Sequence, residues 1–137
     1  MGPQTVSDAT ALCRETLRIL RPSGTAGFTA TIGAPWYDSM KAIFPSFELP
    51  PFLTEVWTKP DIITKELTEL GYKDVQVKPF TFQESEEIEG FVEGMTTFVT
   101  HLKDPERKAA YIKHLKERGD GRVATWNCDT LIITARK

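Results

Sequence analysis

The sequence has few of the residues that form disulfide frameworks or bind metal ions. Its 137 residues include two cysteines and two histidines, Cys13, Cys128, His101 and His114. The cysteines are far apart, and the four residues together lack the spacing of zinc ligands. We therefore expect no disulfide and no metal site, and we interpret both cysteines as small buried apolar residues.

The chain also lacks a long apolar run and a large charge of one sign. No stretch reaches the roughly 18 to 20 apolar residues that span a bilayer, and the N-terminus lacks a basic segment followed by an apolar one. The net charge of -2 and the pI of about 5.7 give no broad positive field for a phosphate backbone. We therefore expect a cytoplasmic protein that binds neither membranes nor nucleic acid.

Enough apolar residues are present for one modest core. Hydrophobic residues make up 40% of the chain and aromatic residues 10%. At this length, two independent domains are not expected. We predict a single domain over 1–137.

The first quarter of the sequence predicts a helix followed by a strand. Ser7 or Asp8 can cap a helix, and Pro22 and Gly24 end it. Its inward positions repeat at helical spacing: Leu12, Cys13, Thr16, Leu17 and Leu20. Residues 25–32 combine β-branched and small residues without regular polar alternation, which is typical of a strand covered on both faces.

The middle of the chain alternates loops, helices and a strand. A short helix is predicted over 37–44, followed by a proline-punctuated aromatic loop over 45–57. Pro60 begins another helix, which Gly71 ends in the position of a left-handed cap. Residues 74–80 then alternate as a strand.

Residues 84–102 show the clearest helical periodicity. Its apolar positions are Ile88, Phe91, Val92, Met95, Phe98, Val99 and Leu102. They predict a long amphipathic helix that buries Phe91, Met95 and Phe98. A further helix follows from Asp104, and together they make a lid-like helical insertion over 84–118 before a last strand over 123–135.

The order of these elements resembles the C-terminal half of class I S-adenosylmethionine-dependent methyltransferases. The segment Leu20-Arg21-Pro22-Ser23-Gly24 is similar to the turn before the fifth strand of that family. The later helix, glycine and strand units are similar to the approach to its sixth and seventh strands. The resemblance implies an α/β fold with a truncated Rossmann-like half-sheet, in which strand seven runs antiparallel between strands five and six.

The same resemblance argues against methylation by this chain alone. The family holds its cofactor at a glycine-rich turn after its first strand and with an acidic residue after its second. Here Gly24 and Gly27 enter a strand, and Gly90 and Gly94 lie in a predicted helix, where we interpret them as close-packing positions. We therefore expect no bound cofactor.

A half-sheet leaves the strand at 25–32 without its outer neighbour. Such an edge invites pairing with another chain. We predict a homodimer through this strand; a separate chain that supplies the missing half is the alternative.

In open α/β sheets, ligands bind beyond the carboxyl ends of the strands, here at 33–38 and 81–84. Trp36 and Tyr37 are candidate substrate-binding residues, and core packing under the loop is the alternative. Three residues of the predicted insertion are candidate walls of the same pocket, or simply pack inward: Met95, Phe98 and Tyr111.

Asp38 and His101 are the candidate catalytic acid and base, because imidazole transfers protons near neutral pH. A structural role for His101 at a helix C-terminus is the alternative. His114, between lysines, is expected to be solvated. No nucleophile and base share a recognisable spacing.

Three functions are compatible with these features. The first is a small-molecule enzyme that catalyses a cofactor-independent isomerisation, cyclisation or elimination in biosynthesis, using orientation and proton transfer. The second is a non-catalytic binding subunit or one half of a split methyltransferase. The third is a fragment of a full-length methyltransferase.

Overall fold

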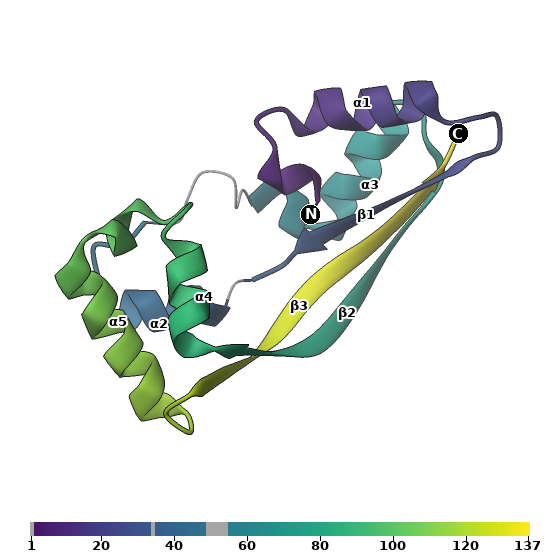
Figure 1. Ribbon diagram of the computed structural model, residues 1–137. Coiled ribbons are helices and arrows are strands. Elements are labelled where there is room, and N and C mark those ends of the chain that lie inside the picture. The colour runs from purple at the N-terminus through teal and green to yellow at the C-terminus, as the bar shows by residue number, and fades with distance from the viewer. Residues whose placement is uncertain (1, 34, 49–54) are drawn as a thin grey trace. The chain divides into compact units, whose positions relative to one another are not determined.

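The computed structural model describes residues 2–33, 35–48 and 55–137 (Figure 1). The middle of the predicted aromatic loop, including Pro50, Pro51 and Phe52, lies outside these residues. The elements in chain order are η1 (Pro3–Thr5), α1 (Ala9–Ile19), β1 (Thr25–Thr31), α2 (Pro35–Ile43), η2 (Glu55–Thr58), α3 (Pro60–Glu69), β2 (Lys73–Glu87), α4 (Ile88–Met95), η3 (Thr100–Lys103), α5 (Pro105–Arg118) and β3 (Val123–Arg136).

The three strands form one antiparallel sheet in the order β1-β3-β2. β3 runs antiparallel to β1, from Thr25 opposite Arg136 to Thr31 opposite Thr130. Hydrogen bonds join Thr81 to Asp129 and Ser85 to Thr125, as expected for antiparallel β2 and β3. The predicted α/β class is confirmed, and the last strand lies between the other two as the resemblance implies.

By its internal contacts the chain divides into two compact units. The first comprises 1–33, 51–81 and 129–137, and the second comprises 34–50 and 82–128. The prediction of a single domain over 1–137 stays a prediction. Of the described helices, none has both the length and the apolar character to cross a membrane.

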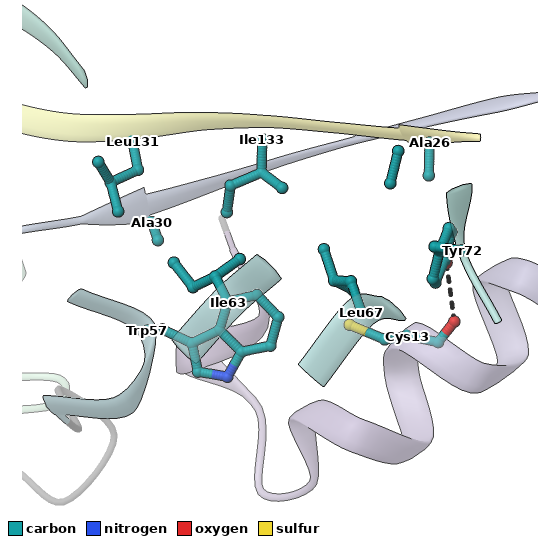
Figure 2. Packing of buried hydrophobic residues seen from close by; sticks show 10 residues of the cluster. Cys13, Ala26, Ala30, Trp57, Ile63, Leu67, Tyr72, Leu131 and Ile133 are labelled. Carbon is teal, nitrogen blue, oxygen red and sulfur yellow. Dashed lines mark hydrogen bonds between the residues drawn. The ribbon is translucent and has the colours of Figure 1, made fainter. Parts of the chain in front are cut away.

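The core of the first unit lies on one face of the sheet (Figure 2). Ile63 and Leu67 of α3 and Cys13 of α1 meet the inward side chains of β1 and β3 there. Those inward side chains alternate along the strands: Ala26, Ala30, Leu131, Ile133 and Ala135. Both helices therefore cover the same face (Figure 1), each capped as expected, α1 by the Asp8 carboxylate and α3 by the left-handed Gly71.

The prediction that the strand over 25–32, now β1, is covered on both faces is wrong for the described residues. Thr25, Gly27 and Thr29 are exposed on the face opposite the helices, and Ile132 of β3 is 40% exposed. The reason is the period of two in a strand: α1 and α3 pack on a single side, so only alternate residues are buried.

Cys13 confirms its predicted role as a small buried residue. Its side chain is fully buried. This burial, and to a smaller extent the negative charge of Glu66, raises the pKa of the Cys13 thiol to about 11. The Tyr72 hydroxyl donates a hydrogen bond of 2.8 Å to the Cys13 carbonyl (Figure 2). Cys128 differs, because it is only partly buried and its Sγ lies 3.4 Å from the Glu84 carboxylate.

The N-terminal segment lies against the outer edge of β1. Gly24 and Ile32 make backbone hydrogen bonds to the strand β3 and its end. In an antiparallel pair, every second residue points its backbone groups toward the partner strand. Thr29 is an odd number of residues from both Gly24 and Ile32, so its carbonyl points away from β3. A Cβ added to Gly2 would overlap that carbonyl oxygen. Gly2 and Pro3 are buried, and Thr5 holds the segment through hydrogen bonds to the Gly2 carbonyl. Part of the edge is therefore covered locally.

We predict that Gly2→Ala destabilises the first unit. The added methyl group would overlap the Thr29 carbonyl, and overpacking of this kind costs about 1 to 3 kcal/mol. The measurement is the free energy of unfolding in urea. Gly27→Ala is the matched control, because no atom lies within 4 Å of a Cβ added there. Equal stability of the two variants would show that the segment does not pack against β1.

In the second unit, the predicted long helix over 84–102 is wrong. β2 continues to Glu87, whose carboxylate caps α4 by accepting from the amides of Glu89 and Gly90. α4 ends at Met95, and the short η3 follows. The apolar spacing is that of one helix because it continues across the turn at 96–98. In that turn the hydroxyls of Thr96 and Thr97 donate hydrogen bonds to the carbonyls of Glu93 and Gly94.

The buried face of this segment also differs from the prediction. Met95 is buried, but Phe91 is only partly buried and Phe98 is 47% exposed. The fully or nearly fully buried positions are Ile88, Val92, Met95, Val99 and Leu102. The glycines do not serve close helix packing: nothing lies near a Cβ added to Gly94, and Gly90 contacts the capping carboxylate.

Candidate functional site

Most of the predicted site residues gather in an aromatic cluster of the second unit. Trp36 stacks on Tyr37 with ring centroids 4.0 Å apart, and its ring also meets that of Phe98 edge-on at 6.4 Å. Tyr111 of α5 is fully buried and donates a hydrogen bond of 3.1 Å to the Trp36 carbonyl. Phe47 links this cluster to His101, at 5.3 Å from Tyr37 and 5.7 Å from the imidazole.

Burial dominates the chemistry of the two tyrosines in this cluster. Burial raises the pKa of the Tyr37 phenol and that of the Tyr111 phenol. At Tyr111 the positive charge of Arg118 partly opposes this rise. The Tyr37 hydroxyl has no hydrogen-bond partner among the described residues. Both rings therefore stay neutral and apolar, which suits a wall or a core better than proton transfer.

His101 lies in η3, in edge-on contact with Phe44 at 4.7 Å. Desolvation lowers the pKa of its imidazole, the nearby Arg107 lowers it further, and Asp104 partly offsets both. The Arg107 guanidinium lies 3.2 Å from Nδ1, which must accept that bond and leaves the proton on Nε2. The interpretation of His101 as a helix-end imidazolium is therefore wrong, because the helix ends at Met95 and the adjacent charge is positive.

A pocket of about 410 Å³ lies between α2, α5 and the first half of β3. Its buried lining residues are Ser39, Leu115, Ala124 and Trp126. The other lining residues are Pro35, Asp38, Arg118, Gly119, Thr125 and Asn127. The Trp126 ring is itself held by Phe91, at a centroid distance of 4.6 Å. The pocket thus combines a small apolar floor with several polar groups.

Two opposite charges line this pocket without pairing with each other. Asp38 and Arg118 are both exposed, and no ion pair joins them among the described residues. Arg118 Nη1 lies 3.4 Å from the hydroxyl oxygen of Ser39, which is 5% exposed. A hydrogen bond of that length is weak, so the guanidinium keeps most of its donors for other partners.

The structure separates the two candidate catalytic residues. Asp38 lines the pocket, whereas His101, Tyr37 and the rest of the aromatic cluster are not among its described lining residues. The strand-end position at 81–84 is also not a loop, because β2 includes it. The roles of the predicted site residues in binding and catalysis stay predictions.

Sequence reasoning missed Ser39, Arg118 and Trp126. Ser39 follows a predicted site residue on α2, and Arg118 is the last residue of α5. Trp126 lies on the predicted last strand, but no sequence signal places it opposite α2. Their convergence depends on the packing of α2 against α5 and on the path of β3.

His114 and the possible metal ligands are the remaining groups to place. His114 is partly buried rather than solvated, and its Nε2 atom has no partner among the described residues. Across the ranges that the structure describes, no three His, Cys, Asp or Glu side chains gather in a way that holds a metal ion.

The described residues also do not fit the cofactor position of the methyltransferase family. Gly24 and Gly27 lie at the entry to β1, and Gly90 and Gly94 lie in α4. Gly24 and Gly27 do not follow a strand. Gly90 lies in the first turn of α4, directly after β2, where that family's glycine-rich turn would be expected, but its amide already donates to the Glu87 carboxylate and is not offered to a cofactor.

The comparisons with known proteins support the fold. A solved structure of a proposed methyltransferase from Bacillus halodurans superposes with a TM-score of 0.55 at 17% sequence identity. The match covers 98% of this chain and 60% of that protein. No protein-family model matches, and no curated protein matches. The chain therefore has a methyltransferase-like fold and spans three fifths of that relative's length.

We predict that His101 titrates below the ordinary imidazole pKa of 6.5. Its folded-state pKa is lowered, so the folded protein binds fewer protons than the unfolded chain, and stability falls as the pH drops below 6.5. The measurement is an NMR titration of the imidazole protons, together with urea unfolding between about pH 5.5 and 7.5.

Two variants control this test. Arg107→Gln removes the charge that lowers the pKa of His101 and should raise that pKa, whereas His101→Gln should remove the contribution of this residue to the pH dependence. Titration of His101 at or above 6.5 in the native protein would contradict the buried, arginine-facing environment.

Proposed function

We propose that this chain forms the substrate side of a methyltransferase-type protein and binds a small molecule in the pocket between α2, α5 and β3. The observation that carries the proposal is the pocket itself, with its apolar floor and convergent polar groups. A volume of about 410 Å³ lies in the range of small-molecule sites. The methyltransferase-like fold supplies the context but not the substrate.

The position of the pocket in the chain supports a ligand site. α2 begins at Pro35, shortly after the carboxyl end of β1 at Thr31. Loops and helices that follow such strand ends carry the ligand contacts in α/β folds. Asp38 and Ser39 both lie on α2. The strand-end rule therefore points, from the sequence, to α2 as one of the two helices that line the pocket.

The proposal predicts that small molecules perturb this pocket selectively. Fragments of mixed aromatic and polar character, added at millimolar concentration, should shift the backbone NMR signals of Leu115, Gly119 and 124–127. The internal control is a shallow hollow on the outer face of α3, formed by Asp61, Thr64, Lys65, Thr68 and Glu69. A single helix forms that hollow and should give no saturable shifts.

An outcome in which no fragment shifts the pocket signals, or in which α3 responds equally, would contradict the proposal. Ser39→Leu places an apolar group on the pocket lining and should weaken any binding that occurs there. A variant that remains folded by its thermal melt but binds undiminished would place the ligand elsewhere.

A cofactor-independent isomerisation, cyclisation or elimination is the second candidate function. Asp38 favours it, because a carboxylate on the pocket lining can act as a general base. His101 has no such support, since it is not among the described lining residues. Once a turned-over compound is found, Asp38→Asn should slow turnover by at least about a hundredfold if Asp38 is the base. His101→Gln is the comparison.

The association of this chain with a second copy or with a complementary half is a further part of the proposal. It rests on the outer edge of β1, of which the Gly2 segment covers the part at Thr29. A split or fragmentary methyltransferase would use the same edge. Sedimentation across a wide concentration range tests the homodimer, and a persistent monomer would remove it.

A further inference from the structure

We infer that the pocket selects a small zwitterion, an amino-acid-like molecule with an ammonium group, a carboxylate and an apolar side chain. This inference rests on the proposed function and names the ligand class of the same site. It comes from the arrangement of Asp38, Arg118 and Trp126 on one pocket of the second unit.

The guanidinium of Arg118 supplies the anion-binding side. Its one described hydrogen bond, to the buried Ser39 hydroxyl, is long at 3.4 Å. Arginine has five donors in a planar fork that matches a carboxylate bidentately. A ligand carboxylate can therefore bind Arg118 and also accept from the Ser39 hydroxyl on the pocket floor.

Asp38 supplies the cation-binding side. Its carboxylate lines the same pocket and has no described salt bridge to Arg118. A purely anionic ligand would bring its charge near that carboxylate, which is unfavourable. A ligand that carries an ammonium group as well as a carboxylate can pair with both Asp38 and Arg118. Its own net charge is zero, so the net charge of the pocket does not change when it binds.

The buried floor supplies the apolar contact. Leu115 is 3% exposed and Trp126 is 8% exposed, and both line the pocket. An indole ring offers a large contact area to an aromatic or aliphatic side chain and attracts a cation over its face. The polar groups at the rim then fix the orientation of the ligand.

Three related probes separate the charges of the ligand. L-phenylalanine carries both groups, 3-phenylpropanoate lacks the ammonium group, and phenethylamine lacks the carboxylate. NMR titration of the pocket amides should give the tightest binding for phenylalanine, at least about tenfold tighter than either analogue, because each charge-assisted hydrogen bond contributes a factor of that order.

Two exposed variants assign the contacts. Asp38→Asn should reduce phenylalanine binding to the level of 3-phenylpropanoate, and Arg118→Gln should reduce it to the level of phenethylamine. Lys113→Gln and Glu117→Gln are matched controls, because this exposed pair lies on the same helix but does not line the pocket. Both controls should bind as the native protein does.

The outcomes distinguish this inference from the proposed function. If the fragments described above shift the pocket signals but phenylalanine does not, the ligand class is wrong and the pocket remains a small-molecule site. Equal binding of all three probes, or binding that is insensitive to Asp38→Asn and Arg118→Gln, also overturns the zwitterion. If neither fragments nor probes bind, both proposals fail together.

Discussion

The antiparallel pairing of β3 with β1 is the constraint on which the first unit depends. Its register sets Ala26 opposite Ala135 and Ala30 opposite Leu131, so that small side chains from both strands lie beside the larger Leu131 on the inward face. A slip of one residue would turn every inward side chain of β3 to the open face. The helices α1 and α3 would then lose the surface against which Cys13, Ile63 and Leu67 pack.

The same strand also shapes the second unit. Ala124 and Trp126, from its first half, line the pocket, while Leu131 and Ile133 belong to the first core. Outside that pocket, the Tyr111 hydroxyl donates a hydrogen bond to the Trp36 carbonyl and so connects α5 to the start of α2. Since Arg118 lies on α5 and Asp38 on α2, this contact helps to fix the two opposite charges on one site.

The fold similarity and the pocket support different kinds of statement. At 17% identity, the likeness to the Bacillus halodurans protein shows a common architecture. Architecture of this kind hosts many activities, so function depends on the side chains of the site. The pocket chemistry is therefore the basis for the proposed ligand, whereas the fold only indicates where a ligand site is to be expected.

The sequence by itself determined the order of most elements. Local signals were sufficient where they were strong, as with the Asp8 cap of α1 and the left-handed Gly71 after α3. Spacing alone failed over 84–102, because the buried positions of α4, of the turn that follows it and of η3 repeat every three or four residues as those of one helix would. The resemblance to the methyltransferase family, rather than periodicity, gave the central position of the last strand.

Only the tertiary structure decided which side chains meet. The sequence grouped His101 with Asp38, but Phe44, Phe47 and Arg107 surround the imidazole. It did not single out Arg118 or Trp126, which are separated from Asp38 by about eighty residues of chain and lie on different elements. Local propensity sets helices and strands through neighbours along the chain, whereas a pocket depends on long-range packing and strand register.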